Sequence, residues 1–254
     1  MPVQGLALNV LVQGASRGIG LAMLRQLLAR HADGRVVATC RQPDQAEALQ
    51  ALAAGSGGRV RVIALELTDE ASISAAAERS AEFIDELQLI LNVGGFLHRP
   101  GQMPERRLAE VESANLIASF AVNAAGPLLV AKHFQRFLPR TGRAVFASLS
   151  ARVGSIGDNR LGGWYAYRGA KAAQNMFTRC LSVELVRRHR GLICVALHPG
   201  TVDTELSRPF QARVAEEKLF SVARAASQLL DVIAALTVED NGAFIAWDGQ
   251  RVEW

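Results

Sequence analysis

Tyr167 and Lys171 are the two side chains whose types and spacing are best suited to chemistry. They are four positions apart in a segment with helical spacing, so both would lie on one face of a helix, one turn apart. A phenol with a pKa of about 10 exchanges protons poorly near neutrality, and a neighbouring ammonium favours the phenolate. The pair therefore predicts acid and base catalysis by Tyr167, although such a pair is more often an ordinary surface feature. Tyr165, with Gly169 four positions later, is expected to pack or to line a pocket.

A glycine-rich loop from Gly14 to Gly20 has the form GxxxGxG, follows an apolar run and leads into a helical pattern. Glycines let the backbone turn sharply and approach a pyrophosphate, while the N-terminus of the following helix offers free N–H groups and partial positive charge. The simpler alternative is a tight turn between a strand and a helix. The position of the loop after the first predicted strand favours dinucleotide binding.

The residues after the second predicted strand indicate which dinucleotide. Enzymes that use NAD usually place a carboxylate there to bind the ribose 2′-hydroxyl, but this chain has Cys40 followed by Arg41. Arg41, together with Arg17 of the glycine loop, could hold a 2′-phosphate through charge-assisted hydrogen bonds. The alternative is that both arginines only face solvent. The pattern favours NADP(H).

Composition excludes several classes of protein. Of the 254 residues, 50% are hydrophobic and 20% are charged, which is typical of a soluble globular chain and not of a disordered one. The net charge of +4 is spread along the chain without a basic run, so no nucleic-acid partner is expected. Cys40, Cys180 and Cys194 have no CxxC spacing and are predicted to be reduced core residues, and no metal site is predicted.

Targeting and membrane segments are also not expected. No basic segment precedes the apolar run near the N-terminus, which argues against a signal peptide. The apolar stretch from Leu116 to Ala131 is interrupted by polar residues, glycine and proline, and is judged too short and too polar to span a bilayer. We therefore expect a cytoplasmic protein with no membrane partner.

Seven short apolar or β-branched runs alternate with helical patterns, which predicts βαβ units in a single domain over residues 1–254. Strands with few polar residues are expected where helices cover both faces of a parallel sheet. We predict a Rossmann-type doubly wound α/β fold, with a seven-stranded sheet in the order 3-2-1-4-5-6-7. The expected strands are residues 7–13, 35–40, 59–65, 87–93, 142–148, 191–198 and 242–247, and the expected helices include 19–30, 45–53, 71–86, 111–137 and 167–188.

Together, the glycine loop, the YxxxK pair and a serine-containing strand end before it resemble the short-chain dehydrogenase/reductase family over essentially the whole chain. Asn92 to Gly95 resembles the family's NNAG segment, with Gly94 in place of alanine. Asn123 resembles the family's active-site asparagine, which holds a water on a proton relay to the lysine; the alternative is a buried asparagine at a kink beside Pro127. His198 to Thr204 resembles the segment that contacts the nicotinamide carboxamide.

The chain departs from the family in two places. Glu66 stands where the family usually has an aspartate that binds the adenine. The residue thirteen positions before Tyr167, where the family commonly has its serine, is Gly154. The longer loop before the tyrosine is similar to the branch of C-factor-like and sniffer-type carbonyl reductases, and alignment on Gly154 selects Ser150 as the active-site serine. Two further serines, Ser148 and Ser155, remain alternatives.

The resemblance implies an NADP(H)-dependent oxidoreductase that interconverts a small carbonyl compound and an alcohol. It further implies an enzyme similar to carbonyl reductases that forms a homodimer or homotetramer. The alternative function is a non-catalytic NADP-binding regulatory or signalling protein of the C-factor-like type. The implied catalytic residues are Tyr167, Lys171, Ser150 and Asn123. The implied cofactor-binding residues are Gly14, Ser16, Arg17, Gly18, Ile19, Gly20, Arg41, Glu66, Leu67, Asn92, Gly94, Tyr167, Lys171, Pro199, Gly200, Val202 and Thr204.

The substrate pocket is expected beyond the carboxyl ends of the strands, between the loops of residues 94–104 and 201–220. Its predicted apolar wall consists of Phe96, Leu97, Trp164 and Phe210, each of which could instead be ordinary packing.

Overall fold

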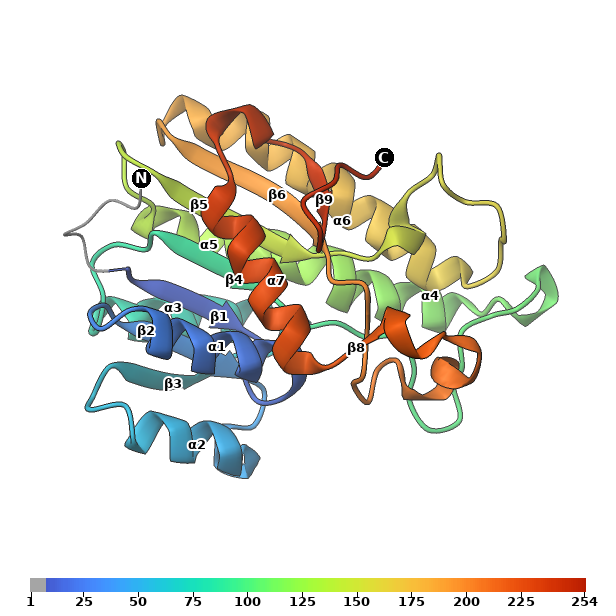
Figure 1. Ribbon diagram of the computed structural model, residues 1–254, viewed down its shortest axis with the longest axis horizontal. Helices are drawn as coiled ribbons and strands as arrows, with labels where there is room; N and C mark the ends of the chain where they lie inside the picture. The colour runs from blue at the N-terminus through green and yellow to red at the C-terminus, as the bar shows by residue number, and fades with distance from the viewer. Residues whose placement is uncertain (1–7) are drawn as a thin grey trace.

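The computed structural model describes residues 8–254 and is built around a parallel seven-stranded sheet (Figure 1). Its strands lie in the order β3-β2-β1-β4-β5-β6-β9, so the predicted order 3-2-1-4-5-6-7 is confirmed, with β9 as the seventh strand. A separate two-residue pair joins β7 (Thr201–Val202) to β8 (Leu219–Phe220). The strands of the main sheet are β1 (Val10–Gln13), β2 (Val36–Cys40), β3 (Val60–Ala64), β4 (Leu89–Asn92), β5 (Ala144–Leu149), β6 (Leu192–His198) and β9 (Phe244–Ala246).

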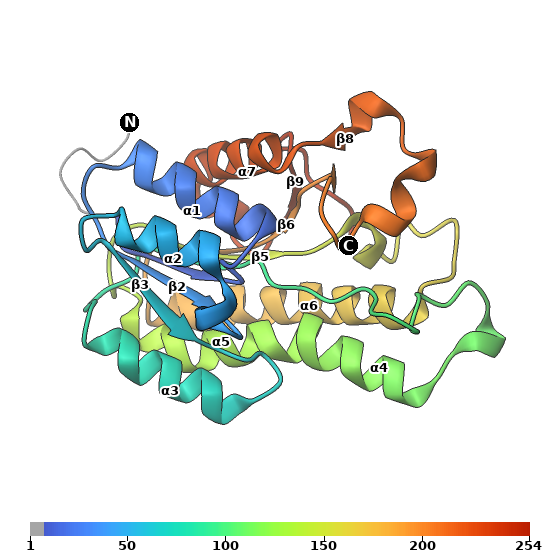
Figure 2. The same cartoon turned by 90° about the horizontal axis from the view of Figure 1, so that it is seen from below.

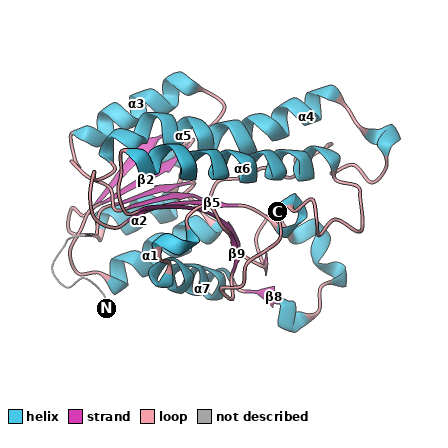
Figure 3. Cartoon of the chain, turned by 90° about the horizontal axis from the view of Figure 1, so that it is seen from above, coloured by secondary structure: helices cyan, strands magenta, loops and turns pink. Residues whose placement is uncertain are grey.

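Helices cover both faces of this sheet, as predicted. On one face lie α1 (Gly18–Arg30), α2 (Glu47–Ala54) and α7 (Val222–Ala235), and on the other lie α3 (Glu70–Ala81), α4 (Ser113–Phe120), α5 (Gly126–Phe134) and α6 (Tyr165–Glu184) (Figures 2 and 3). Successive side chains of a strand point to opposite faces, so Val10 and Val12 enter one core while Leu11 enters the other. Every residue of β1, β2, β4 and β5 is therefore buried.

The long helix predicted over residues 111–137 is interrupted at its centre. Between α4 and α5 lies a π-helical turn, Ala121–Ala125, in which Gly126 N donates to the carbonyl of Ala121, five residues earlier. Pro127 has no N–H to donate to the carbonyl of Asn123, four residues before it, so regular α-helical bonding cannot continue through this point. The turn places Asn123 in the interior.

The structure corrects two expectations from composition. One is that the apolar stretch around residues 116–131 is too short and too polar to span a bilayer, and the other is that all three cysteines are core residues. The continuous helical stretch Ser113–Phe137 is 25 residues long and apolar enough, by length and composition alone, to cross a membrane. However, Val130 and Phe134 of this stretch are fully buried in the core against the sheet. Cys40 and Cys194 are buried as predicted, but Cys180 is exposed on the outer face of α6. The expectation about a signal peptide concerns residues 1–7, which lie outside the described part of the chain.

Candidate active site

The predicted site residues gather where the central strands end. Gln13, the last residue of β1, is in register with Asn92, the last residue of β4, and Asn92 is in register with Ser148 of β5. Because these strands are parallel, the segments that follow them leave the sheet at one edge and meet there. The glycine loop therefore meets the loop of residues 93–112 at Gly94, and that loop meets the segment before α6, where a Cβ on Gly163 would lie 3.3 Å from the carbonyl oxygen of Glu105.

The glycine loop is shaped to accept a phosphate group. α1 begins at Gly18, and the side chain of the preceding Arg17 makes no capping hydrogen bond. The first turn also contains no acidic residue, so the N–H groups and partial positive charge of the helix start are not neutralised by the helix's own side chains. Gly18 has φ +55°, a left-handed conformation that glycine adopts readily. Ser16, Ile19 and Gly20 belong to the same loop and first turn, and the arrangement fits a dinucleotide pyrophosphate.

Gly14 and Gly94 meet so closely that neither could carry a side chain without a shift. A Cβ on Gly14 would lie 2.6 Å from the backbone nitrogen of Gly94. That nitrogen donates a hydrogen bond of 3.0 Å to Oε1 of Gln13. A Cβ on Gly94 would lie 2.8 Å from both polar atoms of the Gln13 side-chain amide. The replacement of the family's alanine by Gly94 is therefore explained by the long side chain of Gln13.

Arg17 and Arg41, predicted to hold a 2′-phosphate, are both exposed at the edge next to the glycine loop. The end of β2 lies against this loop, because Gly14 N donates to the carbonyl of Thr39 at 2.9 Å. Arg17 forms an ion pair with Glu205, from the segment that follows β7. Within residues 8–254, Arg41 takes part in no salt bridge. The two guanidinium groups are thus accessible, although one already has an acidic partner.

Tyr167 and Lys171 lie on the buried side of α6, one turn apart, as their spacing predicts. The ammonium of Lys171 donates to the carbonyl of Leu149, at the end of β5, and to Oε1 of Gln174, both at 2.8 Å. It lies 5.8 Å from the centre of the Tyr167 ring. The lysine is therefore fixed between α6 and the end of the strand that precedes it.

Burial dominates the acid and base properties of this pair. It raises the pKa of the Tyr167 hydroxyl well above its usual value, because the phenolate would lose its hydration. It lowers the pKa of Lys171 to about 7 for the corresponding reason, since the ammonium is also taken out of water. In the protein alone, Tyr167 is thus held in its protonated form, and desolvation outweighs the expected effect of Lys171 on its pKa.

Asn123 binds the loop that follows β4. Its Oδ1 accepts from Phe96 N at 2.9 Å and its Nδ2 donates to Phe96 O at 2.7 Å. The same Nδ2 donates to Oγ of Ser119 at 3.1 Å. A Cβ placed on Gly95 would lie 3.3 Å from Oδ1 of Asn123 and 4.0 Å from Nζ of Lys171. Asn123 and Lys171, distant in sequence, therefore converge on the backbone of one loop.

Ser150 has a hydrogen-bond partner other than the tyrosine. Its hydroxyl is buried and donates to Oδ1 of Asn175, on α6, at 2.7 Å. Its backbone nitrogen donates to the carbonyl of Leu197 at 2.8 Å. These bonds tie the end of β5 to α6 and to β6, and no hydrogen bond among the described residues joins Ser150 to Tyr167.

The two alternative serines are also engaged elsewhere. Oγ of Ser148 accepts from Nδ2 of Asn92 at 3.4 Å, which links the ends of β5 and β4. Oγ of Ser155 accepts from the backbone nitrogen of Asp158 at 3.0 Å within the loop before α6. All three serines are buried.

Glu66 and Leu67 follow β3 at the same edge of the sheet. One carboxylate oxygen of Glu66 accepts from the backbone nitrogen of Thr68 at 3.0 Å, so it closes a local turn. Leu67 packs closely on Gly126, where a Cβ would lie 2.8 Å from the Cβ of Leu67. The pair thus fixes the connection between β3 and the start of α5.

The segment after β6 lies beside the glycine loop. Pro199 and Gly200 make the turn into β7, and Gly200 has φ +77°. Val202 is buried, while Cγ2 of Thr204 lies 3.6 Å from the position of a Cβ on Gly18. The predicted nicotinamide segment and phosphate loop are therefore neighbours.

A row of aromatic rings leads to Tyr167. The ring centre of Phe210 lies 5.8 Å from that of His98 and 4.7 Å from that of Trp164, and Trp164 meets Tyr167 edge to face at 6.4 Å. Trp164 has φ +51° and precedes the first residue of α6. The predicted wall residues Trp164 and Phe210 are thus brought together from two distant segments.

Three polar residues of this region were missed by sequence reasoning. Gln174 and Asn175 lie three and four positions after Lys171, so helical spacing could have placed them on the same buried face. Glu105 is buried near the start of α6, and its backbone carbonyl accepts from Trp164 N at 2.5 Å. No sequence pattern connects Glu105 to a helix that begins sixty residues later.

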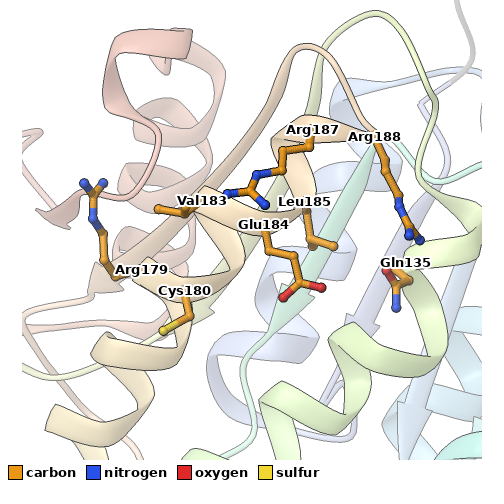
Figure 4. Close-up of a pocket in the computed structure, with 8 residues that line it drawn as sticks. All are labelled: Gln135, Arg179, Cys180, Val183, Glu184, Leu185, Arg187 and Arg188. Atoms are coloured by element: carbon orange, nitrogen blue, oxygen red, sulfur yellow. The ribbon is translucent and has the colours of Figure 1, made fainter.

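A hollow of about 640 Å³ lies at the other end of α6 (Figure 4). At 1.5 Å per residue, that end of the helix is roughly 25 Å from Tyr167. None of the predicted site residues lines it, so it is separate from the candidate active site. Its lining residues are Gln135, Arg179, Cys180, Val183, Glu184, Leu185, Arg187 and Arg188.

Comparison with known proteins agrees with this geometry. A family model described as short chain dehydrogenase matches residues 8–215. The chain belongs to the short-chain dehydrogenase family. The predicted resemblance to this family is thereby confirmed, and the chain is an oxidoreductase by family.

Within the short-chain dehydrogenase family, carbonyl reductases are among the similar solved structures. The NADPH-bound carbonyl reductase from chicken fatty liver is 33% identical with a TM-score of 0.86, over 98% of this chain and 100% of that one. The carbonyl reductase Sniffer of Drosophila melanogaster is 25% identical with a TM-score of 0.83, over the same shares. The C-signal protein of Myxococcus xanthus is 35% identical over 147 residues, which are 58% of this chain and 83% of that protein. The predicted similarity to the C-factor-like and sniffer-type branch is confirmed.

Proposed function

We propose that the protein is an NADP(H)-dependent carbonyl reductase in which Tyr167 is the general acid and base. The observation that carries the proposal is the convergence of Tyr167, Lys171 and Asn123 at the edge of the sheet where the glycine loop begins α1. A phosphate-binding loop and an acid–base pair on one edge suit hydride transfer coupled to proton transfer.

In the proposed reduction, Tyr167 donates its proton to the carbonyl oxygen of the substrate. The bound cofactor supplies the hydride for the carbonyl carbon. Because burial raises the pKa of Tyr167, the hydroxyl is protonated at neutral pH and ready to act as the acid. The ammonium of Lys171 lies beside the ring, and in our proposal Lys171 and a water held by Asn123 supply the path by which the proton is replaced.

The preference for NADP(H) is supported by three features of the chain. Arg17 and Arg41 flank the position expected for the 2′-phosphate, and no carboxylate follows β2 directly. The carbonyl reductase from chicken fatty liver binds NADPH. In our proposal Glu66 and Leu67 border the adenine, while the segment Pro199 to Thr204 contacts the nicotinamide.

For the substrate oxygen, Ser150 is our first assignment and Ser148 and Ser155 are the alternatives. Because the Ser150 hydroxyl donates to Asn175, it can assist a substrate only if it exchanges that acceptor for the substrate oxygen. We expect the kcat values of three variants to differ: Ser150→Ala, Ser148→Ala and Ser155→Ala. The variant with the largest loss of kcat identifies the serine that binds the substrate oxygen.

The test of the proposed function is NADPH binding followed by turnover. Purified protein is titrated with NADPH and NADH by fluorescence, and NADPH oxidation is then followed with a panel of aldehydes, ketones and quinones. Tyr167→Phe should remove turnover and leave NADPH affinity nearly unchanged, while Tyr165→Phe, on the exposed face of the same turn, should behave as wild type. Turnover retained in Tyr167→Phe, or a preference for NADH, would contradict the proposal.

A second candidate function is an NADP-binding regulator or signalling protein, which the similarity to C-signal favours. It would bind NADPH through the same loop but would oxidise none over the whole panel. NADPH affinity without turnover therefore distinguishes this candidate from the reductase.

We further propose a homo-oligomer in the cytoplasm, assembled through the outer faces of α4 and α6. Exposed apolar side chains of these two helices include Ile117, Phe120, Met176 and Val183. An exposed apolar face of this kind is typical of protein interfaces. Size-exclusion chromatography with light scattering should give the mass of a dimer or tetramer, and Ile117→Glu with Met176→Glu should give a monomer.

A further inference from the structure

A buried carboxylate lies at the start of the helix that carries Tyr167. Glu105 is only 3% exposed, although the next residue of the loop that follows β4, Arg106, is exposed. Its Oε2 accepts from the backbone nitrogen of Ala166 at 3.2 Å, and its own carbonyl accepts from Trp164 N at 2.5 Å. One residue thus satisfies two N–H groups at the entry of α6.

The residues around the start of α6 provide no side-chain cap for this end of the helix. The first N–H groups of a helix lack partners within the helix, and a Ser, Thr, Asp or Asn just before it usually supplies the acceptor. Here the preceding residue is Trp164, whose indole only donates, and the first turn contains no acidic residue. Glu105 therefore supplies from another loop the acceptor that the local sequence lacks.

The approach of the two segments also depends on Gly163. It has φ +65°, and a Cβ there would lie 3.3 Å from the carbonyl oxygen of Glu105. The loop before α6 and the loop of Glu105 therefore meet backbone to backbone. Such a junction leaves the first turn of the helix little freedom to shift.

Ala166, the residue directly before Tyr167, is held through both its backbone N–H and its backbone carbonyl. Its nitrogen donates to Glu105, and its carbonyl accepts from Oγ of Ser119 at 3.1 Å. Ser119 in turn accepts from Nδ2 of Asn123. A continuous set of hydrogen bonds thus runs from Glu105 through the backbone beside Tyr167 to the asparagine of the proposed relay.

Glu105 acts through this backbone and not on the substrate itself. It borders a cavity of about 10 Å³, which has room for at most one water and none for a carbonyl compound. Tyr167 lines the same cavity. The other lining residues are Phe96, Leu97, Gln102, Met103, Pro104, Asn115, Ser119 and Ala166.

We propose that Glu105 is a positioning residue for Tyr167: its side chain caps α6 from a distant loop and so sets the place of the phenol relative to the reacting carbonyl. This inference rests on the proposed catalytic function of Tyr167. Because the cap needs an acceptor on the side chain and not a charge, glutamine should replace glutamate while alanine should not.

The test compares Glu105→Ala, Glu105→Gln and a matched control, Glu110→Ala. Glu110 is also a glutamate whose carboxylate accepts from a backbone nitrogen, that of Arg106 at 2.9 Å, but it is exposed and its hydrogen bonds stay within its own loop. NADPH affinity is measured by fluorescence, and kcat and KM are measured with 4-nitrobenzaldehyde or with the panel compound that wild type reduces fastest.

Glu105→Ala is expected to lower kcat by about tenfold or more, because small displacements of a catalytic group are costly, while the dissociation constant for NADPH changes by less than about twofold. Glu105→Gln should restore kcat to within about threefold of wild type, since its amide oxygen can still accept from Ala166 N. Glu110→Ala should match wild type.

Three outcomes would overturn the proposal: wild-type kcat in Glu105→Ala, no rescue by Glu105→Gln, or a parallel loss of NADPH affinity and kcat. If Glu105→Ala does not fold, Ser119→Ala removes the other anchor of Ala166 and should give the same kcat loss without loss of NADPH binding. Tyr167→Phe in the same assay separates the two proposals. If it is inactive while the Glu105 variants are not, only the positioning role fails; if it is fully active, the proposed function itself fails.

Discussion

Asn123 holds the peptide groups of Phe96 from both sides, accepting from its nitrogen at 2.9 Å and donating to its carbonyl at 2.7 Å. The asparagine comes from the π-helical turn between α4 and α5, whereas Phe96 belongs to the loop after β4. A buried side-chain amide is suited to this task because it offers a donor and an acceptor side by side. The loop that borders Tyr167 is therefore fastened by the same residue that the proposed relay uses.

Substitution of Asn123 should damage the loop in a way that depends on the replacement. Asn123→Ala leaves the Phe96 nitrogen and carbonyl without partners and should cost about 2 to 4 kcal/mol of unfolding free energy. Asn123→Asp keeps the acceptor but places a carboxylate oxygen against the Phe96 carbonyl, so it should be at least as damaging as Asn123→Ala. Urea unfolding and kcat measure both effects, and an aspartate variant more stable than the alanine variant would contradict this account.

Gln13 and Gly94 should behave as a coupled pair. Gly94→Ala places a methyl group 2.8 Å from the Gln13 amide and should destabilise the protein by about 1 to 3 kcal/mol. In the background of Gln13→Thr, whose side chain is shorter, the same change should cost less by about 1 kcal/mol or more. A double-mutant cycle by urea unfolding gives the coupling. Additive effects of the two substitutions would show that the amide is not the obstacle.

Glu205 should weaken the binding of a phosphorylated cofactor. Its ion pair with Arg17 competes with the proposed 2′-phosphate for the guanidinium. Both side chains are exposed, so removal of the competitor by Glu205→Gln should tighten NADPH binding by only about two- to fivefold, the range of exposed ion pairs, with NADH affinity unchanged. Asp203→Asn, which changes a neighbouring carboxylate that contacts Gln211, is the matched control. Equal shifts for NADPH and NADH would refute the competition.

Lys171 should make the stability of the cofactor-free protein rise with pH. The pKa of Lys171 is about 7 in the folded protein and 10.5 in a solvated chain. Between these two pH values the unfolded chain therefore binds a proton that the folded chain does not. Below pH 7 burial of the ammonium lowers the free energy of unfolding by its full amount. As the pH rises toward 10.5 this penalty disappears, so the free energy of unfolding rises by up to about 1.4 kcal/mol per pH unit. Above pH 10 the raised pKa of Tyr167 acts in the opposite direction.

The measurement is urea unfolding of wild type and Lys171→Met from pH 7 to 9.5, where Tyr167 stays protonated in both states. Wild type should gain stability with pH more steeply than Lys171→Met. Parallel curves would mean that Lys171 keeps an ordinary pKa in the folded protein.

The sheet and the glycine loop could be predicted because each depends on local sequence. Alternation of apolar runs and helical patterns gave the seven strands and their order, and a GxxxGxG loop after the first strand placed α1. Tyr167 and Lys171 were predictable for a similar reason, because the spacing of four within one helix fixes their relation whatever the rest of the chain does.

The residues that could not be predicted depend on contacts between distant segments. The exposure of Cys180 follows from which face of α6 meets the core, and the partner of Ser150 follows from the approach of β5 to α6. Glu105 caps a helix of another segment, and no local pattern reports such a bond. Pro127 indicated locally that the helix is irregular near Asn123. A proline alone, however, does not distinguish a π-helical turn within a continuous helix from the end of that helix.

Trp164 is, among residues 8–254, the one non-glycine residue with a positive φ, and its ring packs between Phe210 and Tyr167. A left-handed conformation costs an L-residue about 1 kcal/mol or more, which glycine would avoid. Glycine, however, would remove the ring from the wall beside the catalytic phenol. Selection of variants for heat resistance would therefore favour glycine at position 164, whereas selection for turnover would favour tryptophan.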